Sequence, residues 1–470
     1  MATIIFAIAD SISHYNASYK IANQLRNHGH KIIYIGDSIK RKKEVEGQDF
    51  EFQIIYSNFF KSFETSGKKG FLNRLSNIGG HLKNLAAYRR AVIKGDEIQK
   101  VIESLKPDLF IIDVFHIIHA ISIWKYGIKT MLLQTYVATD KDKNVPPLNS
   151  GLIPSGSFLN KLLIEFAWLR LFVRRKVLSV FNYIIFLGLD KASLLRDVVK
   201  RSGLKPGELN YERCFHPGLK NLPELILCAQ EFDFPRENRA NRYFVGPMVE
   251  LERRDMLYDA AYLDLMLDME IKSSLANEPE KPIIYCSLGT LNVSWYKHSE
   301  KFFNILIDAF KQNNKYELLI SVGTDIKPEV FGDVPDNVHI FQLVPQIDIL
   351  ERASLMITHG GINSINECIV SGVPMIVYPL SRQIDQPGNA ARIKYHGLGL
   401  IGDIKKETPE GILQKVDAII SDEIYKKRIE KMRSVYRHYS NANLAALLAE
   451  YYMTDEHAWL NNDTKLTPKD

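Results

Sequence analysis

The sequence predicts an α/β protein made of two doubly wound domains, each a parallel sheet covered by helices. Three observations lead to this fold class. The chain has 470 residues, more than a single hydrophobic core usually sustains. Short apolar runs alternate with longer amphipathic runs over the first 135 residues. The same alternation returns after residue 281.

The first half begins the β-α rhythm. The expected strands are residues 4–9, 31–36, 109–113 and 128–134, and the expected helices are 15–27 and 117–125. Strands that are separated by helices run parallel, in a sheet that is buried on both of its faces. This part of the chain therefore predicts one doubly wound sheet.

The second half repeats the pattern more regularly. Its expected strands are residues 282–286, 317–322, 339–343, 355–358 and 375–378, each followed by a turn and a helix. Gly246-Pro247 ends a strand candidate at 242–245, and a charged stretch follows it. We therefore expect an N-terminal domain over 1–248, a linker over 249–281 and a C-terminal domain over 282–470, whose last helix can cross back to the first domain.

Residues 136–240 interrupt the rhythm and are interpreted as an insertion. Within them, 158–181 combines apolar residues at helical spacing with five cations, as a helix at a membrane surface would. The alternative is a helix that lines an apolar cleft or packs on the core, and we prefer it. Peripheral membrane contact through 158–181 stays the second interpretation.

Composition narrows the classes of function. A net charge of +5 lacks the clustered basic footprint of a nucleic-acid binder, so no nucleic-acid partner is expected. The four cysteines form no C-x-x-C pair and lie in or beside apolar runs, as reduced core thiols of a cytoplasmic protein do. The N-terminus lacks the basic region of a signal peptide, and no apolar run is long enough to span a bilayer.

The stretch from Ala353 to Glu367 carries the strongest chemical signal. It predicts a buried strand, the turn His359-Gly360-Gly361 and a helix closed by Gly372. The first N–H groups of a helix attract anions, and glycines allow a phosphate to approach the backbone. We expect a diphosphate at this turn, with Ser364 and Glu367 on one helix face beside it.

Two further pairs of residues follow strands. Asp385 and Gln386 open a helix after the strand at 375–378, where they can bind vicinal sugar hydroxyls or simply cap the helix. His14 opens the first helix and Asp113 ends the strand at 109–113, so both can project into one cleft at the carboxyl edge of the sheet.

These residues together resemble a known family. The motifs Val-Pro-Gln-x-x-x-Leu, His-Gly-Gly-x-Asn-Ser-x-x-Glu, Gly-Val-Pro and Asp-Gln-Pro-x-Asn-Ala between Val344 and Gly399 are similar to the donor signature of the family 1 UDP-sugar glycosyltransferases. The resemblance implies two Rossmann-like domains that face each other across a cleft. The N-terminal domain would bind the acceptor and the C-terminal domain the nucleotide sugar.

The resemblance also implies a role for each site residue. His359 and Ser364 meet the diphosphate, Glu367 the ribose, Asp385 and Gln386 the sugar, and Ser287 the phosphates from a second turn. The implied donor-binding set is Ser287, Gly289, Thr290, Val344, Gln346, His359, Gly360, Gly361, Asn363, Ser364, Glu367, Asp385 and Gln386. Leu343 replaces a tryptophan that often stacks on the base in this family, with Phe341 two residues earlier. The choice between UDP and dTDP therefore stays open.

The implied reaction is an inverting transfer of a sugar from a UDP-sugar to a hydroxyl of a small, hydrophobic acceptor. His14 would be the base and Asp113 the carboxylate that orients it, with His116 and His119 as rivals whose helical positions favour packing. No cofactor is expected. The alternatives are a nucleotide-sugar epimerase or hydrolase of the same fold, or a non-catalytic nucleotide-binding subunit.

Two motifs are set aside. Gly397 to Gly402 satisfies G-x-G-x-x-G, but the run follows a helix and leads into a strand, the reverse of a dinucleotide site. Asp140-Lys141-Asp142 has the spacing of metal-dependent sugar transferases, yet we interpret it as a solvated loop and expect no metal.

Overall fold

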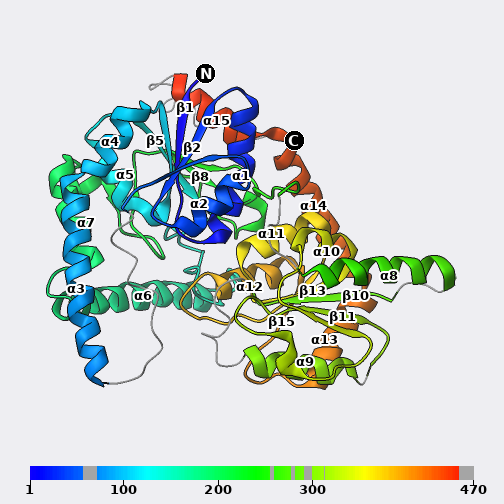
Figure 1. The fold of residues 1–470 in the computed structure, drawn as a ribbon. Helices are drawn as coiled ribbons and strands as arrows, with labels where there is room; N and C mark the ends of the chain where they lie inside the picture. The colour runs from blue at the N-terminus through cyan, green and yellow to red at the C-terminus, as the bar shows by residue number, and fades with distance from the viewer. Residues whose placement is uncertain (57–70, 254–258, 277–280, 290–298, 312, 455–470) are drawn as a thin grey trace.

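The computed structural model describes residues 1–56, 71–253, 259–276, 281–289, 299–311 and 313–454. These residues form two parallel-sheet α/β domains with a smaller two-stranded sheet (Figure 1). The predicted fold class is confirmed. Among the described residues, no helix is long and apolar enough to cross a membrane.

The N-terminal sheet has the strand order β3-β2-β1-β4-β5-β8-β9, with every neighbouring pair parallel. Its strands are β1 (Thr3–Ala7), β2 (Lys31–Gly36), β3 (Glu51–Ile54), β4 (Leu109–Asp113), β5 (Lys129–Gln134), β8 (Glu224–Ile226) and β9 (Arg242–Phe244). Its helices include α1 (Ile12–Asn27), α2 (Ile39–Glu46), α3 (Phe71–Lys94), α4 (Asp96–Leu105), α5 (Ile117–Trp124), α6 (Phe158–Ile185) and α7 (Lys191–Ser202). Separate apolar clusters cover its two faces, as a doubly wound sheet requires.

The C-terminal sheet has the order β12-β11-β10-β13-β14-β15 and is also parallel throughout. Its strands are β10 (Ile283–Ser287), β11 (Glu317–Ser321), β12 (Val338–Phe341), β13 (Ala353–Thr358), β14 (Met375–Val377) and β15 (Gly399–Ile401). Its helices include α9 (Ser299–Lys311), α10 (Gln346–Arg352), α11 (Ile362–Ser371), α12 (Gln386–His396), α13 (Pro409–Ser421) and α14 (Glu423–Ala442).

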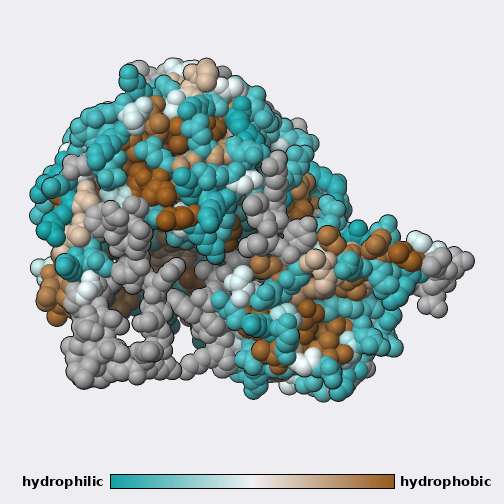
Figure 2. Space-filling model, viewed as in Figure 1, coloured by the Kyte–Doolittle hydropathy of each residue, from teal (hydrophilic) through white to brown (hydrophobic). Residues whose placement is uncertain are grey.

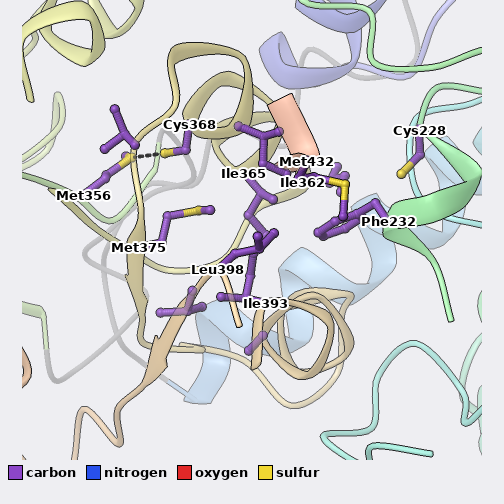
Figure 3. Packing of buried hydrophobic residues seen from close by; sticks show 14 of the residues in the cluster. Cys228, Phe232, Met356, Ile362, Ile365, Cys368, Met375, Ile393, Leu398 and Met432 are labelled. Atoms are coloured by element: carbon purple, nitrogen blue, oxygen red, sulfur yellow. Dashed lines mark hydrogen bonds between the residues drawn. The ribbon is translucent and has the colours of Figure 1, made fainter. Parts of the chain in front are cut away.

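One apolar cluster joins the two domains. Figure 3 shows Cys368 of α11 against Met356 of β13, with their sulfur atoms 3.2 Å apart. The same cluster reaches Cys228 and Phe232, which follow β8 of the first sheet. All four cysteines are buried free thiols, as the sequence predicted. This core is continuous from one sheet to the other.

The chain ends on the domain where it began. Helix α15 (Leu444–Thr454) packs Ala445 and Leu448 into the apolar cluster that covers β1 and α1. The Lys129 ammonium of β5 donates a hydrogen bond of 2.8 Å to the Met453 carbonyl. Figure 1 shows this red segment beside the blue strands of the N-terminal sheet.

The expectation of an insertion at residues 136–240 needs correction. The stretch is not wholly an insertion, because β8 lies inside the sheet and pairs with β5 and β9. This strand has only three residues and starts with Glu224, whose buried carboxylate accepts a hydrogen bond of 2.5 Å from Arg213. Sequence patterning cannot identify so short a strand with a charged end.

Helix α6 forms where a helix was expected and packs on the core as we preferred, but only through one narrow side. Only Ile164 and Trp168 are buried among its 28 residues. The apolar residues that suggested a core helix, such as Phe166 at 63% and Val173 at 54%, are exposed. These exposed apolar residues lie on the side of the helix opposite to Trp168, so they cannot reach the core on which Trp168 packs.

Candidate active site

The two sheets place their central carboxyl edges at the cleft between the domains. In each sheet the chain first adds strands on one side of the sheet's first strand and then adds the remaining strands on its other side. The direction of strand order reverses between β1 and β4 in the first sheet, and between β10 and β13 in the second. Ligands of open α/β sheets bind at such reversal points. The site residues predicted from the sequence follow these four strands or their neighbours.

His14 and Asp113 meet at the reversal point of the first sheet. Nδ1 of His14 and Oδ2 of Asp113 are 2.6 Å apart, and the other Asp113 oxygen accepts from the Phe115 N–H at 2.9 Å. Burial raises the pKa of Asp113, but the neighbouring His14 and these hydrogen bonds outweigh it and hold the pKa below its usual value. The carboxylate is therefore ionised at neutral pH and keeps the His14 proton on Nδ1.

Two residues that sequence reasoning missed complete the surroundings of His14. The Tyr136 hydroxyl lies 3.3 Å from Nε2 of His14, and the Thr135 hydroxyl lies 3.2 Å from Nδ1. Burial and the charges of Asp385 and Asp113 raise the pKa of Tyr136 well above its usual range, so it is a hydrogen-bond donor to Nε2. Both residues follow β5 directly, and their place at the carboxyl edge was the available signal.

The rival histidines are packing residues, as expected. Nε2 of His116 lies 3.1 Å from the Ile8 carbonyl. His119 is buried and stacks on Tyr56, with ring centroids 5.7 Å apart. Burial lowers the pKa of both imidazoles, so they are neutral groups of the core.

The Gly-Gly turn lies at the reversal point of the second sheet. Gly360 has a φ of +86°, and Gly361 is the N-cap of α11 without a side-chain cap. A Cβ atom at Gly361 would lie 2.6 Å from Nε2 of His359, and one at Gly289 would lie 2.5 Å from Cε1 of the same ring. The two glycines thus make room for the His359 ring between the ends of β13 and β10.

His359 is a neutral, buried side chain at this turn. Burial lowers its pKa to about 4, so the ring is neutral at physiological pH. Its Nδ1 is buried and has no hydrogen-bond partner within the part of the chain that the structure describes. Ser287 ends β10 beside this ring, and its hydroxyl accepts from the Gly289 N–H at 3.4 Å. Thr290, the remaining member of this turn, lies outside the described residues.

Glu367 holds a polar cluster on α11. Its carboxylate accepts hydrogen bonds from Nε2 of Gln346 at 2.5 Å and from the Arg253 guanidinium at 3.0 Å. Nε2 of Gln346 also donates to the Ser364 hydroxyl at 3.1 Å. The structure therefore brings Gln346, Ser364 and Glu367 together. Arg253, just after the N-terminal domain, is a partner that sequence reasoning missed.

Asp385 and Gln386 lie side by side but differ in surroundings. Asp385 is buried, one of its oxygens accepts from the Asn389 amide at 2.7 Å, and burial raises its pKa to about 6. Its charge also helps to raise the pKa of Tyr136 across the cleft. The Gln386 side-chain oxygen accepts from the backbone N–H groups of Leu380 and Ser381, so it holds the preceding loop.

The segment expected to bind the base lies after β12. Phe341 is buried in the core against Tyr262, with ring centroids 6.0 Å apart, so its ring is not available for stacking on a base. Val344 is also buried, while Leu343 is partly exposed and its carbonyl accepts from the Asp259 N–H at 3.0 Å.

A hydrogen bond joins the two halves of the site. The Asn363 amide of α11 donates to the Ser13 carbonyl at the start of α1. A small cavity lies between these helices, lined among others by Asn16, Arg253 and Glu367. His14 and the Gly-Gly turn thus lie on opposite walls of one interdomain region.

Asp140-Lys141-Asp142 is not the solvated loop that we expected. Asp140 is only 4% exposed and forms ion pairs with Arg213 and Arg242, which come from distant parts of the chain. Asp142 is also buried and accepts from the Glu237 N–H at 3.0 Å. These acids are neutralised by cations and N–H groups. The Gly397 run, in contrast, does end a helix and enter β15, as predicted.

Comparison with known proteins gives a family match over nearly the whole chain. Residues 3–461 match the family described as UDP-glucoronosyl and UDP-glucosyl transferase. An NDP-glycosyltransferase of Bacillus licheniformis is 30% identical over 250 residues, which cover 53% of this chain and 57% of that protein. A zeaxanthin glucosyltransferase of Pantoea ananas is 28% identical over 256 residues, covering 54% and 53%. The chain thus spans about half the length of these curated relatives.

Solved structures share the fold. The glycotransferase of kitacinnamycin superimposes with a TM-score of 0.67 at 19% identity, over 96% of this chain and 99% of that one. The calicheamicin glycosyltransferase CalG4 gives a TM-score of 0.64 at 19% identity, over 99% and 100%. At this identity the likeness concerns the two-domain architecture.

Proposed function

Because the chain belongs to the UDP-glucoronosyl and UDP-glucosyl transferase family, we propose that it transfers a sugar from a UDP-sugar to a hydroxyl of a small hydrophobic acceptor. The observation that carries this proposal is the pairing of His14 with Asp113 opposite the Gly-Gly turn. The matched family and the similar proteins are transferases by name, not epimerases or hydrolases, and a non-catalytic subunit needs no dyad. The alternatives are therefore not favoured.

His14 acts as the base in this proposal. Its Nδ1–H donates to Asp113, so Nε2 carries the free lone pair and receives the proton of the acceptor hydroxyl. The Tyr136 hydroxyl occupies that position in the free protein, 3.3 Å from Nε2, and marks where the acceptor oxygen enters. Asp113 is a positioning residue, and its negative charge stabilises the imidazolium that forms.

The transfer is a single displacement. As the acceptor oxygen loses its proton to His14, it bonds to the anomeric carbon, and the bond from that carbon to the diphosphate oxygen breaks on the opposite side. The configuration at carbon inverts, and UDP leaves with the bonding electrons. Negative charge grows on the diphosphate, which the uncapped N–H groups of α11 and the neutral His359 ring stabilise.

The donor-binding roles are part of the same proposal. Ser287, Ser364 and His359 bind the diphosphate, and Glu367 binds the ribose by exchanging the Arg253 and Gln346 donors for hydroxyls. Asp385 accepts hydrogen bonds from the sugar, while Gln386 acts mainly through the loop that it holds. The base lies near Val344 and Gln346. We propose that no metal takes part and that the enzyme works in the cytoplasm, where buried free thiols stay reduced.

The acceptor wall is apolar and aromatic. The rings of Phe115 and Tyr136 stand edge-on to His14 at centroid distances of 5.1 and 5.6 Å, with Phe215 beyond Tyr136. Such a wall suits a hydrophobic alcohol or phenol. The carotenoid substrate in the name of the Pantoea relative agrees with this class.

The test is a screen of UDP- and dTDP-sugars against hydrophobic alcohols and phenols, with products detected by mass spectrometry. The proposal expects an acceptor mass increased by one sugar residue, without added metal and in the presence of a chelator. A sugar released to water with every acceptor, or an isomerised nucleotide sugar, would support the alternative enzymes instead.

A further inference from the structure

Helix α6 presents a long apolar face to its surroundings. Its packed side carries Ile164 and Trp168, and the Trp168 indole N–H donates to the Val145 carbonyl at 2.8 Å. The opposite side is lined by apolar residues that are 50% to 67% exposed: Leu159, Leu162, Phe166, Val173, Val177 and Ile184. At 100° per residue these six side chains lie within a narrow stripe about 38 Å long. Figure 1 shows α6 along the lower edge of the N-terminal domain.

Cations flank this stripe. Arg170, Arg174 and Lys176 are exposed, and helical geometry puts Arg170 and Arg174 on one flank and Lys176 on the other. No acidic partner is found for these three within the described ranges. The single acid of the helix, Glu165, pairs with Lys141 at 2.7 Å.

We propose that α6 docks on the surface of an anionic lipid bilayer. A helix with one apolar face and cationic flanks lies in the plane of the interface, its apolar side chains among the acyl chains and its cations at the headgroups. A second copy of the chain fits less well. A twofold contact would press the same face of each copy together and would oppose Arg170 and Arg174 to like charges.

The docked helix adjoins the proposed acceptor wall. The loop that accepts the Trp168 hydrogen bond continues to Leu148, whose carbonyl would lie 2.1 Å from a Cβ atom at Gly388 of α12. The same segment begins at Tyr136, beside His14. In so far as the proposed function holds, docking would bring a membrane-dissolved acceptor close to the site. The docking itself does not depend on that chemistry.

The experiment is vesicle flotation of the full chain without nucleotide or acceptor. Vesicles of phosphatidylcholine mixed with phosphatidylglycerol should carry the protein, and vesicles of phosphatidylcholine alone should carry much less. The paired change Phe166→Glu and Val173→Glu should abolish binding. Arg170→Gln with Arg174→Gln should weaken it roughly 30-fold, since each cation near an anionic surface contributes about a factor of five.

The matched control is Leu267→Glu on α8 (Ala260–Ala276). Leu267 is 58% exposed, with Leu263 and Ile271 of the same helix also exposed. Figure 2 shows apolar surface at the right of the molecule, where Figure 1 shows α8. The neighbours of Leu267 include the acidic Asp264 and Asp268, so this change should leave vesicle binding intact. Circular dichroism checks that each variant folds, and nucleotide binding, measured separately, tests the proposed function independently.

Two results would overturn the docking. One is a wild-type protein that fails to float with the anionic vesicles, or floats equally well after both glutamates are introduced. The other is a dimer in sedimentation velocity that dissociates when Phe166 and Val173 become glutamate, which would assign the stripe to a second copy of the chain.

Discussion

Burial of the Asp385 carboxyl group disfavours its ionised form. Asp385 is 7% exposed, and the Asn389 side-chain amide donates a hydrogen bond to it. Burial raises its pKa from 3.8 to about 6. A carboxyl that binds its proton more tightly in the folded chain than in the unfolded chain makes the protein less stable as the pH rises between these two values.

The change Asp385→Asn removes the charge and keeps the shape and the Asn389 hydrogen bond. A difference of about 2.2 pKa units corresponds to about 3 kcal/mol. The asparagine variant should therefore be more stable than the wild type by up to about 3 kcal/mol near pH 8, and by only about 1.5 kcal/mol near pH 5. The transfer rate of the wild type should fall below about pH 6, as the carboxylate proposed to accept hydrogen bonds from the sugar hydroxyls takes up a proton.

Denaturant unfolding of both proteins at the two pH values measures this effect. Asp113→Asn is the matched control, because the pKa of that buried carboxyl is lowered instead of raised. It should lose stability relative to the wild type by the same amount at pH 8 and at pH 5, because this carboxyl is ionised at both pH values in the folded and the unfolded chain. The reasoning fails if Asp385→Asn is the less stable protein at pH 8, or if its gain is the same at both pH values.

Three further substitutions test separate parts of the site. Asp113→Asn should lower kcat by about 10³- to 10⁴-fold with little change in nucleotide affinity. The amide would turn its N–H toward the imidazole and select the wrong tautomer. Steady-state kinetics in which this variant retains more than a tenth of the wild-type activity would count against the dyad. Glu367→Gln should weaken UDP binding roughly 10- to 100-fold by loss of a charge-assisted acceptor, and an unaltered dissociation constant by calorimetry would remove the ribose role. Gly289→Ala should also weaken UDP binding, by about tenfold or more, because the added Cβ would lie 2.5 Å from Cε1 of His359. Gly127→Ala is the control: Gly127 also has a positive φ but has open space around it, so this variant should bind UDP normally.

Much of the fold could be predicted because parallel buried strands appear as continuous apolar runs. The strands expected at 31–36 and 109–113 are β2 and β4 with the same bounds. Helix α11 ends where Gly372 predicted, since that residue takes a φ of +76° that favours glycine. The positions of His14 and Asp113 followed from the same logic, because each stands where a predicted strand meets the sheet edge.

What the sequence did not reveal depends on partners that are distant along the chain. Asp140 forms ion pairs with Arg213 and Arg242, which come from distant parts of the chain. No pattern in the sequence around Asp140 predicts these pairs. The contact between Tyr136 and His14 joins residues 122 positions apart. The outward-facing stripe of α6 has the periodicity of a core helix, so the sequence alone could not say which environment covers it.

The central claim is that the base and the donor site are separate parts of one cleft. The most direct measurement compares His14→Ala with the wild type in single-turnover transfer and in UDP binding by calorimetry. The account predicts that transfer is lost by about 10³-fold or more while the dissociation constant for UDP stays within about twofold. Transfer at the wild-type rate, or a loss of UDP affinity as large as the loss of rate, would contradict it.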